Sequence, residues 1–116
     1  MIDNLSDDLI SELTINGWNA KKIVTIGIPS IIYIIEAKKG DRVIVIYPLS
    51  GINRKYIQLD RDIYIDLKKY KKKRKIPVYI AVKFSSTWTF KEISHIENCI
   101  IYRSDPGDLD KENICW

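Results

Sequence analysis

A run of five apolar residues at 31–35 is followed directly by Glu36, Ala37 and Lys38. A continuous apolar run rich in β-branched residues is typical of a strand that is covered on both faces. Because side chains alternate along a strand, Ile34, Glu36 and Lys38 share one face. An unpaired charge is costly inside a core, so Glu36 and Lys38 mark either the end of the strand, where it meets water, or a site.

Residues 4–16 are predicted to form a helix, because leucines recur along them at the helical spacing of four and Gly17 follows as a stop signal. Three strands are expected next, at 18–26, 31–38 and 42–47. A turn at 27–30 and a short hairpin loop at 39–41 connect them. Pro48 then ends the third strand.

The segment 58–73 is predicted to be a second helix, because Ile63, Leu67 and Tyr70 recur at helical spacing. The alternation of apolar residues near Ile63 leaves a strand open as the alternative. Further strands are expected at 78–84, 88–93 and 98–102. A strand that follows a helical crossover can lie parallel to an earlier one. The order α-β-β-β-α-β-β therefore predicts an α/β fold with a mixed β-sheet.

The 116 residues suffice for one domain, expected at 1–102, with a polar tail at 103–116. The sequence contains neither a signal peptide nor an apolar run long enough to span a membrane, so we expect a soluble, cytoplasmic protein. Cys99 is interpreted as a small core residue, with a disulfide to Cys115 as the alternative. A high content of Ile, Lys and Tyr suggests an AT-rich genome, which would fit an archaeon or an archaeal virus.

The net charge of +4 is distributed unevenly. Residues 21–83 hold sixteen basic residues against five acidic ones, a net of +11, and both flanking segments are acidic. Seven of the eight residues at 68–75 are cationic: Lys68, Lys69, Lys71, Lys72, Lys73, Arg74 and Lys75. Two or three cations would suit the end of a helix dipole, but seven repel one another, which an anionic partner relieves. A polyanion is therefore the expected partner.

Other basic residues are expected to extend this surface: Lys21, Lys22, Lys38, Lys39, Arg42, Arg54, Lys55 and Arg61. No segment has the pattern of a base-reading helix, so we expect contacts to phosphates rather than to base edges. Tyrosines in the same region either stack on bases or, as is more common in such patterns, lie half-buried in the core: Tyr47, Tyr56, Tyr64, Tyr70 and Tyr79.

Several features then follow one another in a characteristic order: Gly-Trp-Asn-Ala at 17–20 after an early helix, Ile-Glu-Ala-Lys at 35–38, Gln58 at the start of a helix, Ile-Pro-Val-Tyr-Ile-Ala-Val-Lys-Phe at 76–84, and Trp88. This succession resembles the archaeal Holliday junction resolvases, which are restriction-endonuclease-like nucleases. The resemblance covers about residues 5–102. It implies the restriction-endonuclease-like fold, a homodimer, and a metal-dependent endonuclease that acts on branched DNA.

In these nucleases a Glu-x-Lys sequence supplies a metal-ligating carboxylate and a lysine that assists the attacking water. By the resemblance, Glu36 would bind Mg²⁺ and Lys38 would be the assisting lysine. The family also has an acid on the first helix and another on the preceding strand. Ser6 stands at the first of these positions, and no Asp or Glu occurs from Gly17 to Ile35. The predicted metal site is incomplete.

We therefore expect a DNA-binding protein with weak or no cleavage. Two alternatives are open. One is an active Mg²⁺-dependent junction endonuclease that uses Glu36, Lys38 and an acid of the first helix. The other is a non-catalytic structural or interaction subunit, in which the lysine run would engage an acidic protein.

Overall fold

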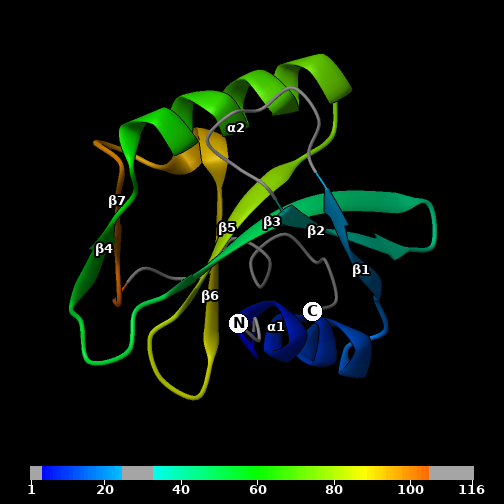
Figure 1. Ribbon diagram of the computed structural model, residues 1–116, viewed down its shortest axis with the longest axis horizontal. Helices are drawn as coiled ribbons and strands as arrows, with labels where there is room; N and C mark the ends of the chain where they lie inside the picture. The colour runs from blue at the N-terminus through cyan, green and yellow to red at the C-terminus, as the bar shows by residue number, and fades with distance from the viewer. Residues whose placement is uncertain (1–3, 25–32, 105–116) are drawn as a thin grey trace.

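The structure, a computed structural model, describes residues 4–24 and 33–104. A five-stranded β-sheet lies at its centre, with the strand order β1-β2-β3-β5-β6 (Figure 1). The strands span Asn19–Val24 (β1), Tyr33–Lys39 (β2), Arg42–Ser50 (β3), Val78–Lys83 (β5) and Trp88–Glu92 (β6). Neighbouring strands are antiparallel except β3 and β5, which run parallel. The predicted mixed sheet is confirmed.

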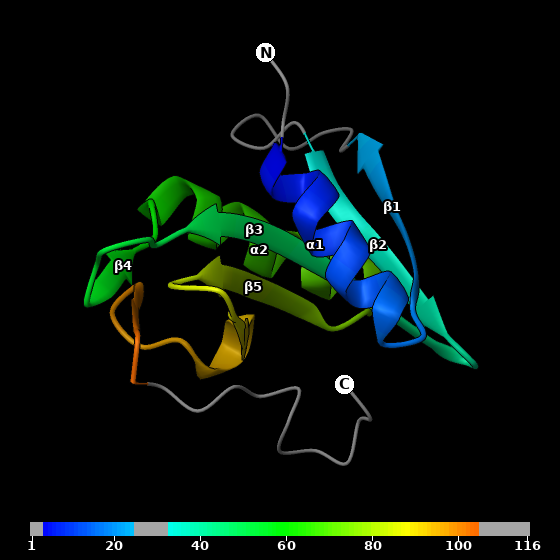
Figure 2. The same cartoon turned by 90° about the horizontal axis from the view of Figure 1, so that it is seen from below.

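Two helices cover opposite faces of this sheet, as Figure 2 shows. Helix α1 (Asn4–Ile15) packs on the face that carries Ile35 of β2. Helix α2 (Arg61–Arg74) packs on the face that carries Ile34. These two isoleucines are neighbours on β2 and are both buried, so the strand is covered on both faces, as its apolar run predicted. Within the described residues, no helix is both long and apolar enough to cross a membrane.

A second, two-stranded antiparallel sheet joins β4 (Tyr56–Gln58) to β7 (Ile100–Tyr102). A 3-10 turn, η1 (Ile93–His95), follows β6. The sequence pattern did not predict β4. It did predict a strand near β7, but β7 pairs with β4 and not with the main sheet.

The predicted start of the second helix at Gln58 is wrong by three residues. Gln58 ends β4, and α2 begins at Arg61. The reason is the cap: the Asp60 carboxylate accepts hydrogen bonds from the backbone N–H groups of Asp62 and Ile63, at 2.9 and 3.4 Å. A carboxylate at this position satisfies amides that have no partner within the helix. Gln58, which the resemblance placed at the start of a helix, therefore lies three residues before that helix.

The predicted end of the third strand at Pro48 is also wrong, because β3 continues to Ser50. The N–H groups of Val45 and Gly51 donate to carbonyls on the β5 side, so by alternation the nitrogen of Pro48 faces the β2 side. Pairing with β2 stops at Ile46, so the missing N–H of Pro48 breaks no ladder there.

The other predicted elements agree with the structure to within one or two residues wherever it describes them. The predicted turn at 27–30, the flanking ends of the first two strands, and the tail from 105 lie outside the described residues. The proposed disulfide partner Cys115 lies there too. Arg103, placed in the tail by its composition, donates its backbone N–H to the Lys55 carbonyl at 2.9 Å and its guanidinium to the Phe84 carbonyl at 2.6 Å.

Candidate nucleic-acid interface

The cationic run at 68–75 occupies the last turns of α2 and its C-cap. The helix is held on the sheet by Leu67, which is fully buried. On the opposite side of the helix, exposed lysines recur at i, i+1, i+4 and i+5, which places them on one outward face: Lys68, Lys69, Lys72 and Lys73. We call these four residues the α2 lysine face. Lys75 ends the helix in the left-handed conformation, with φ of 56°, and its N–H donates to the Lys71 carbonyl.

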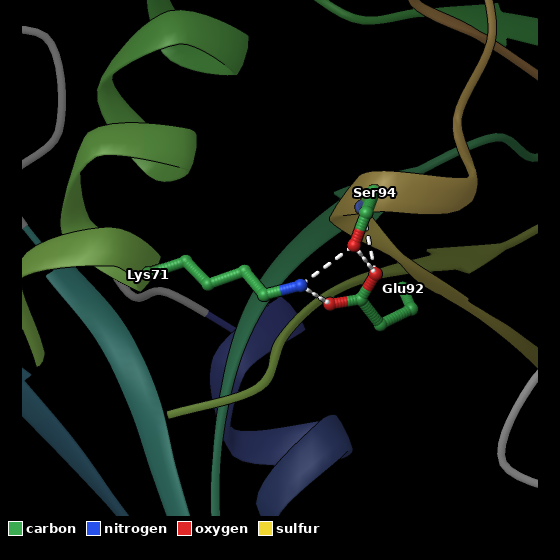
Figure 3. A network of polar contacts seen from close by, with 3 residues as sticks. All are labelled: Lys71, Glu92 and Ser94. Carbon is green, nitrogen blue, oxygen red and sulfur yellow. Dashed lines mark hydrogen bonds and ion pairs between the residues drawn. The ribbon is translucent and has the colours of Figure 1, made fainter. Parts of the chain in front are cut away.

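Lys71 differs from its neighbours because it points toward the protein (Figure 3). Its Nζ lies 2.5 Å from Oε1 of Glu92 and 2.6 Å from Oγ of Ser94. Both the backbone N–H and the hydroxyl of Ser94 donate to the other oxygen of Glu92. Burial alone would raise the pKa of Glu92, but the hydrogen bonds from Lys71 and Ser94 outweigh it and lower that pKa. Lys71 is therefore engaged in fixing the end of α2 against β6 and η1.

Two further cations of the run lie over aromatic rings. Nζ of Lys68 is 5.2 Å from the centre of the Tyr64 ring, and the guanidinium carbon of Arg74 is 5.8 Å from that of Tyr70. Contacts of this kind orient a cation but leave its charge accessible. Both cations remain exposed at the surface.

The Glu-x-Lys sequence lies on β2, on the sheet face that α2 covers, because Glu36 alternates with Ile34 of the α2 cluster. Oε1 of Glu36 is 3.8 Å from Nζ of Lys38 and 3.8 Å from Nζ of Lys21 on β1. The structure thus brings Glu36, Lys38 and Lys21 together. The carboxylate is held between two ammonium groups, both of them more than half exposed.

The acids of α1 lie across the sheet from Glu36, because α1 covers the opposite face. Asp8, one of these acids, forms an ion pair with Lys83 of β5 on that face. Within the described residues, no group of three or more potential metal ligands comes together. A single carboxylate between two ammonium groups is a poor ligand set for Mg²⁺, which is held by carboxylates together with phosphate oxygens and water. These residues do not fit the metal that the resemblance implies.

Three of the predicted DNA-binding residues face the α1 side instead. Nζ of Lys39 donates to the Asn16 carbonyl at 2.8 Å, just beyond α1, and lies 5.6 Å from the centre of the Trp18 ring. Lys39 thereby fastens the end of α1 to the β2–β3 hairpin. Lys22 lies over the Tyr33 ring at 4.8 Å, and Arg42, opposite Lys39 in the β-ladder, is exposed.

The remaining three are exposed: Arg54 and Lys55 in the loop before β4, and Arg61 at the start of α2. Of the five tyrosines considered above, Tyr79 is buried and only Tyr56 is largely exposed, at 51%. Burial raises the pKa of Tyr47, and the nearby Asp60 adds to this effect. The sequence pattern gave no signal for Tyr102, which lies directly opposite Tyr56 on β7. Only the pairing of β4 with β7 reveals this relation.

Comparison with known proteins agrees with the fold described here. No protein-family model matches the chain, and no curated protein sequence matches it. Among solved structures, that of Hjc, a Holliday junction resolvase from the archaeal hyperthermophile Archaeoglobus fulgidus, is similar with a TM-score of 0.67 and 24% sequence identity. The match covers 87% of this chain and 83% of that one. The chain therefore has the restriction-endonuclease-like fold of an archaeal Holliday junction resolvase, and the predicted resemblance is confirmed at the level of the fold.

Proposed function

We propose that the protein binds DNA through the phosphate backbone, with a preference for branched DNA, and cleaves it weakly or not at all. The observation that carries this proposal is the α2 lysine face, four exposed lysines on the outward side of a helix whose position is fixed by Leu67 and Lys71. The preference for branched DNA rests on the fold shared with the archaeal resolvase.

The geometry of the face favours phosphate contacts. A neutralised phosphate contributes about −0.9 to the slope of log K against log salt. Four contacts would give a slope of about −3.6, so affinity would fall about a hundredfold between 50 and 200 mM salt. Lys21 and Lys38 lie on the same side of the sheet as α2, although each shares its charge with Glu36.

The residues around Glu36 support the proposal of weak or no cleavage. The acids of α1 that would complete a metal site lie on the other side of the sheet.

We propose that the protein acts as a homodimer, as the resemblance implies. A two-fold interface is self-complementary, so a contact through the α2 lysine face would oppose lysines to lysines. We expect the two copies to meet through another surface. Sedimentation at twice the 13.6 kDa mass of the chain would support the dimer, and sedimentation at that mass would contradict it.

The test is a fluorescence anisotropy titration with a labelled four-way junction and with a linear duplex of one arm, over a series of salt concentrations. The double variant Lys69→Gln, Lys72→Gln should weaken binding to both and reduce the magnitude of the salt slope by about 1.8. The matched control is Lys22→Gln, Arg42→Gln, which removes the same charge from the opposite side of the sheet. It should leave the slope nearly unchanged.

The same samples, incubated with Mg²⁺ or Mn²⁺ and resolved on a denaturing gel, test cleavage. Cleavage that disappears in Glu36→Gln and Lys38→Met would show an active endonuclease and would overturn the non-cleaving proposal. Failure to bind either DNA at 50 mM salt would overturn the DNA-binding function. It would favour the interaction-subunit alternative.

A further inference from the structure

The outer side of the small β4–β7 sheet presents two tyrosine rings to solvent. Tyr56 and Tyr102 are directly opposite in the antiparallel ladder, and their side chains are 51% and 50% exposed. Their ring centres are 6.1 Å apart with the planes inclined at 50°. The alternate residues, Ile57 and Ile101, point inward and are buried in the core. The sheet is therefore anchored on one side and open on the other.

Packing within the small sheet does not account for the exposure of these rings. A cross-strand aromatic pair stabilises a sheet only modestly, and the two rings remain half in water. The next outward-facing pair along the two strands is Gln58 and Ile100, and this pair carries no aromatic ring. Two half-exposed aromatic rings side by side suit a ligand that stacks.

Basic residues flank the two tyrosines along the chain. Arg54 and Lys55 directly precede Tyr56, and Arg103 directly follows Tyr102. Beside Tyr102 is a cavity of about 290 Å³, lined also by Lys91, His95, Glu97, Asn98 and Ile100. Of the neighbouring cations, Arg103 is engaged with the Phe84 carbonyl, whereas Arg54 and Lys55 are exposed. Aromatic rings with adjacent cations are the combination by which proteins hold single-stranded nucleic acid.

We propose that Tyr56 and Tyr102 form a stacking platform for unpaired nucleotides of DNA, with Arg54 and Lys55 contacting the phosphates beside them. The bases inside a duplex are already stacked on both faces, so a side chain stacks much more readily on bases that are unpaired. Suitable bases occur in single strands, in flaps and at an open branch point. This inference rests on the proposed function, because it assumes that the ligand is DNA. The platform is separate from the α2 lysine face, which would bind the phosphates of paired and unpaired DNA alike.

The test compares three labelled probes by anisotropy: an oligothymidine of twelve nucleotides, a duplex with a single-stranded flap of that length, and the blunt duplex. The variant Tyr56→Val, Tyr102→Val keeps β-branched residues suited to strands but removes both rings. It should lose about tenfold in affinity for the single strand and the flap, and less than twofold for the blunt duplex. The variant Tyr56→Phe, Tyr102→Phe should stay within twofold of wild type on all probes.

Tyr33→Ala is the matched control, because Tyr33 is 47% exposed but lies on β2 of the main sheet and not on the β4–β7 sheet. It should leave all three affinities within twofold. Equal affinity of the valine variant and the wild type for the single strand would overturn the platform. So would an equal loss on the blunt duplex.

Two further results separate this inference from the function on which it rests. If the wild type binds the blunt duplex and the flap adds nothing, the platform is overturned and the proposed function stands. If the wild type binds none of the probes, the proposed function is overturned as well. Conversion of a dimer into a monomer by the valine variant, measured by sedimentation, would assign the tyrosines to a contact between copies and overturn the platform.

Discussion

The end of α2 depends on one of its seven cations, and Lys71→Met tests that dependence. The substitution keeps the aliphatic part of the side chain and removes only the ammonium group. Glu92 then loses the 2.5 Å contact with Nζ and retains the two donors of Ser94. The Glu92 side chain is only 10% exposed, so water cannot fully replace the missing partner.

The expected loss in the free energy of unfolding near pH 7 is about 2 kcal/mol. A hydrogen bond to a charged group contributes about 1.5–3 kcal/mol. The lower part of this range applies, because Lys71 is 36% exposed and is partly screened by solvent. Lys72→Met is the control. Lys72 is the next residue of the helix and is exposed, so its loss should change stability by less than about 0.5 kcal/mol.

The effect should depend on pH in a defined direction. The pKa of Glu92 is lowered in the folded protein, so its contribution to stability is complete above the unfolded pKa of about 4.3 and is lost as the pH falls through the folded value. In Lys71→Met, Glu92 loses one of the hydrogen bonds that oppose the effect of burial, so the pKa of Glu92 moves upward. The difference between wild type and variant should therefore be largest near neutral pH and should shrink below about pH 5.

Urea unfolding followed by tryptophan fluorescence at pH 7, 5 and 4 measures this difference. A loss below about 0.5 kcal/mol at pH 7 would refute the anchoring role of Lys71. A loss of the expected size that stays constant from pH 7 to pH 4 would refute the assignment of the effect to the Glu92 carboxylate.

Other substitutions separate structural contacts from contacts with DNA. Lys39→Ala should lower the free energy of unfolding, measured by urea titration, by about 1–2 kcal/mol, because it removes the hydrogen bond to the Asn16 carbonyl. It should leave the DNA affinity, measured by anisotropy, within twofold of wild type. Gly51→Ala should destabilise by about 1–3 kcal/mol, read as a lower Tm, because its Cβ would stand 2.8 Å from the Phe84 ring. Glu36→Gln should raise DNA affinity roughly two- to fivefold at low salt, because two neighbouring lysines lose their shared carboxylate, and an unchanged affinity would contradict this.

The elements predicted correctly are those specified by local signals. Helix α1 follows from leucines spaced by four, and the β2–β3 hairpin follows from Gly40, whose φ is 60°. The strand β4 has no such signal, because it is three residues long and pairs with β7, more than forty residues later. Gln58, the last residue of β4, falls within the predicted helix at 58–73, so the periodicity assigned it to the wrong element. A partner far along the chain overrode the local pattern.

The sequence also could not predict which cations of the run at 68–75 contact the protein and which face solvent. Lys71 and Lys72 are identical neighbours, and only the packing of α2 directs the first toward Glu92 and the second to solvent. A run of like charges predicts that an anionic partner is needed somewhere. It does not predict which lysine is already satisfied within the protein.

The candidate metal site shows the same limit most clearly. Alternation along β2 correctly groups Glu36 with Ile34, so the face of the strand on which Glu36 lies was predictable. Because Ile34 and Ile35 are both buried, the apolar pattern is equally compatible with α1 on either face. An acid of α1 can reach Glu36 only if α1 covers the face of the sheet on which Glu36 lies. The structure places α1 with Ile35, so the sheet itself separates the α1 acids from Glu36, and Glu36 is left between Lys21 and Lys38.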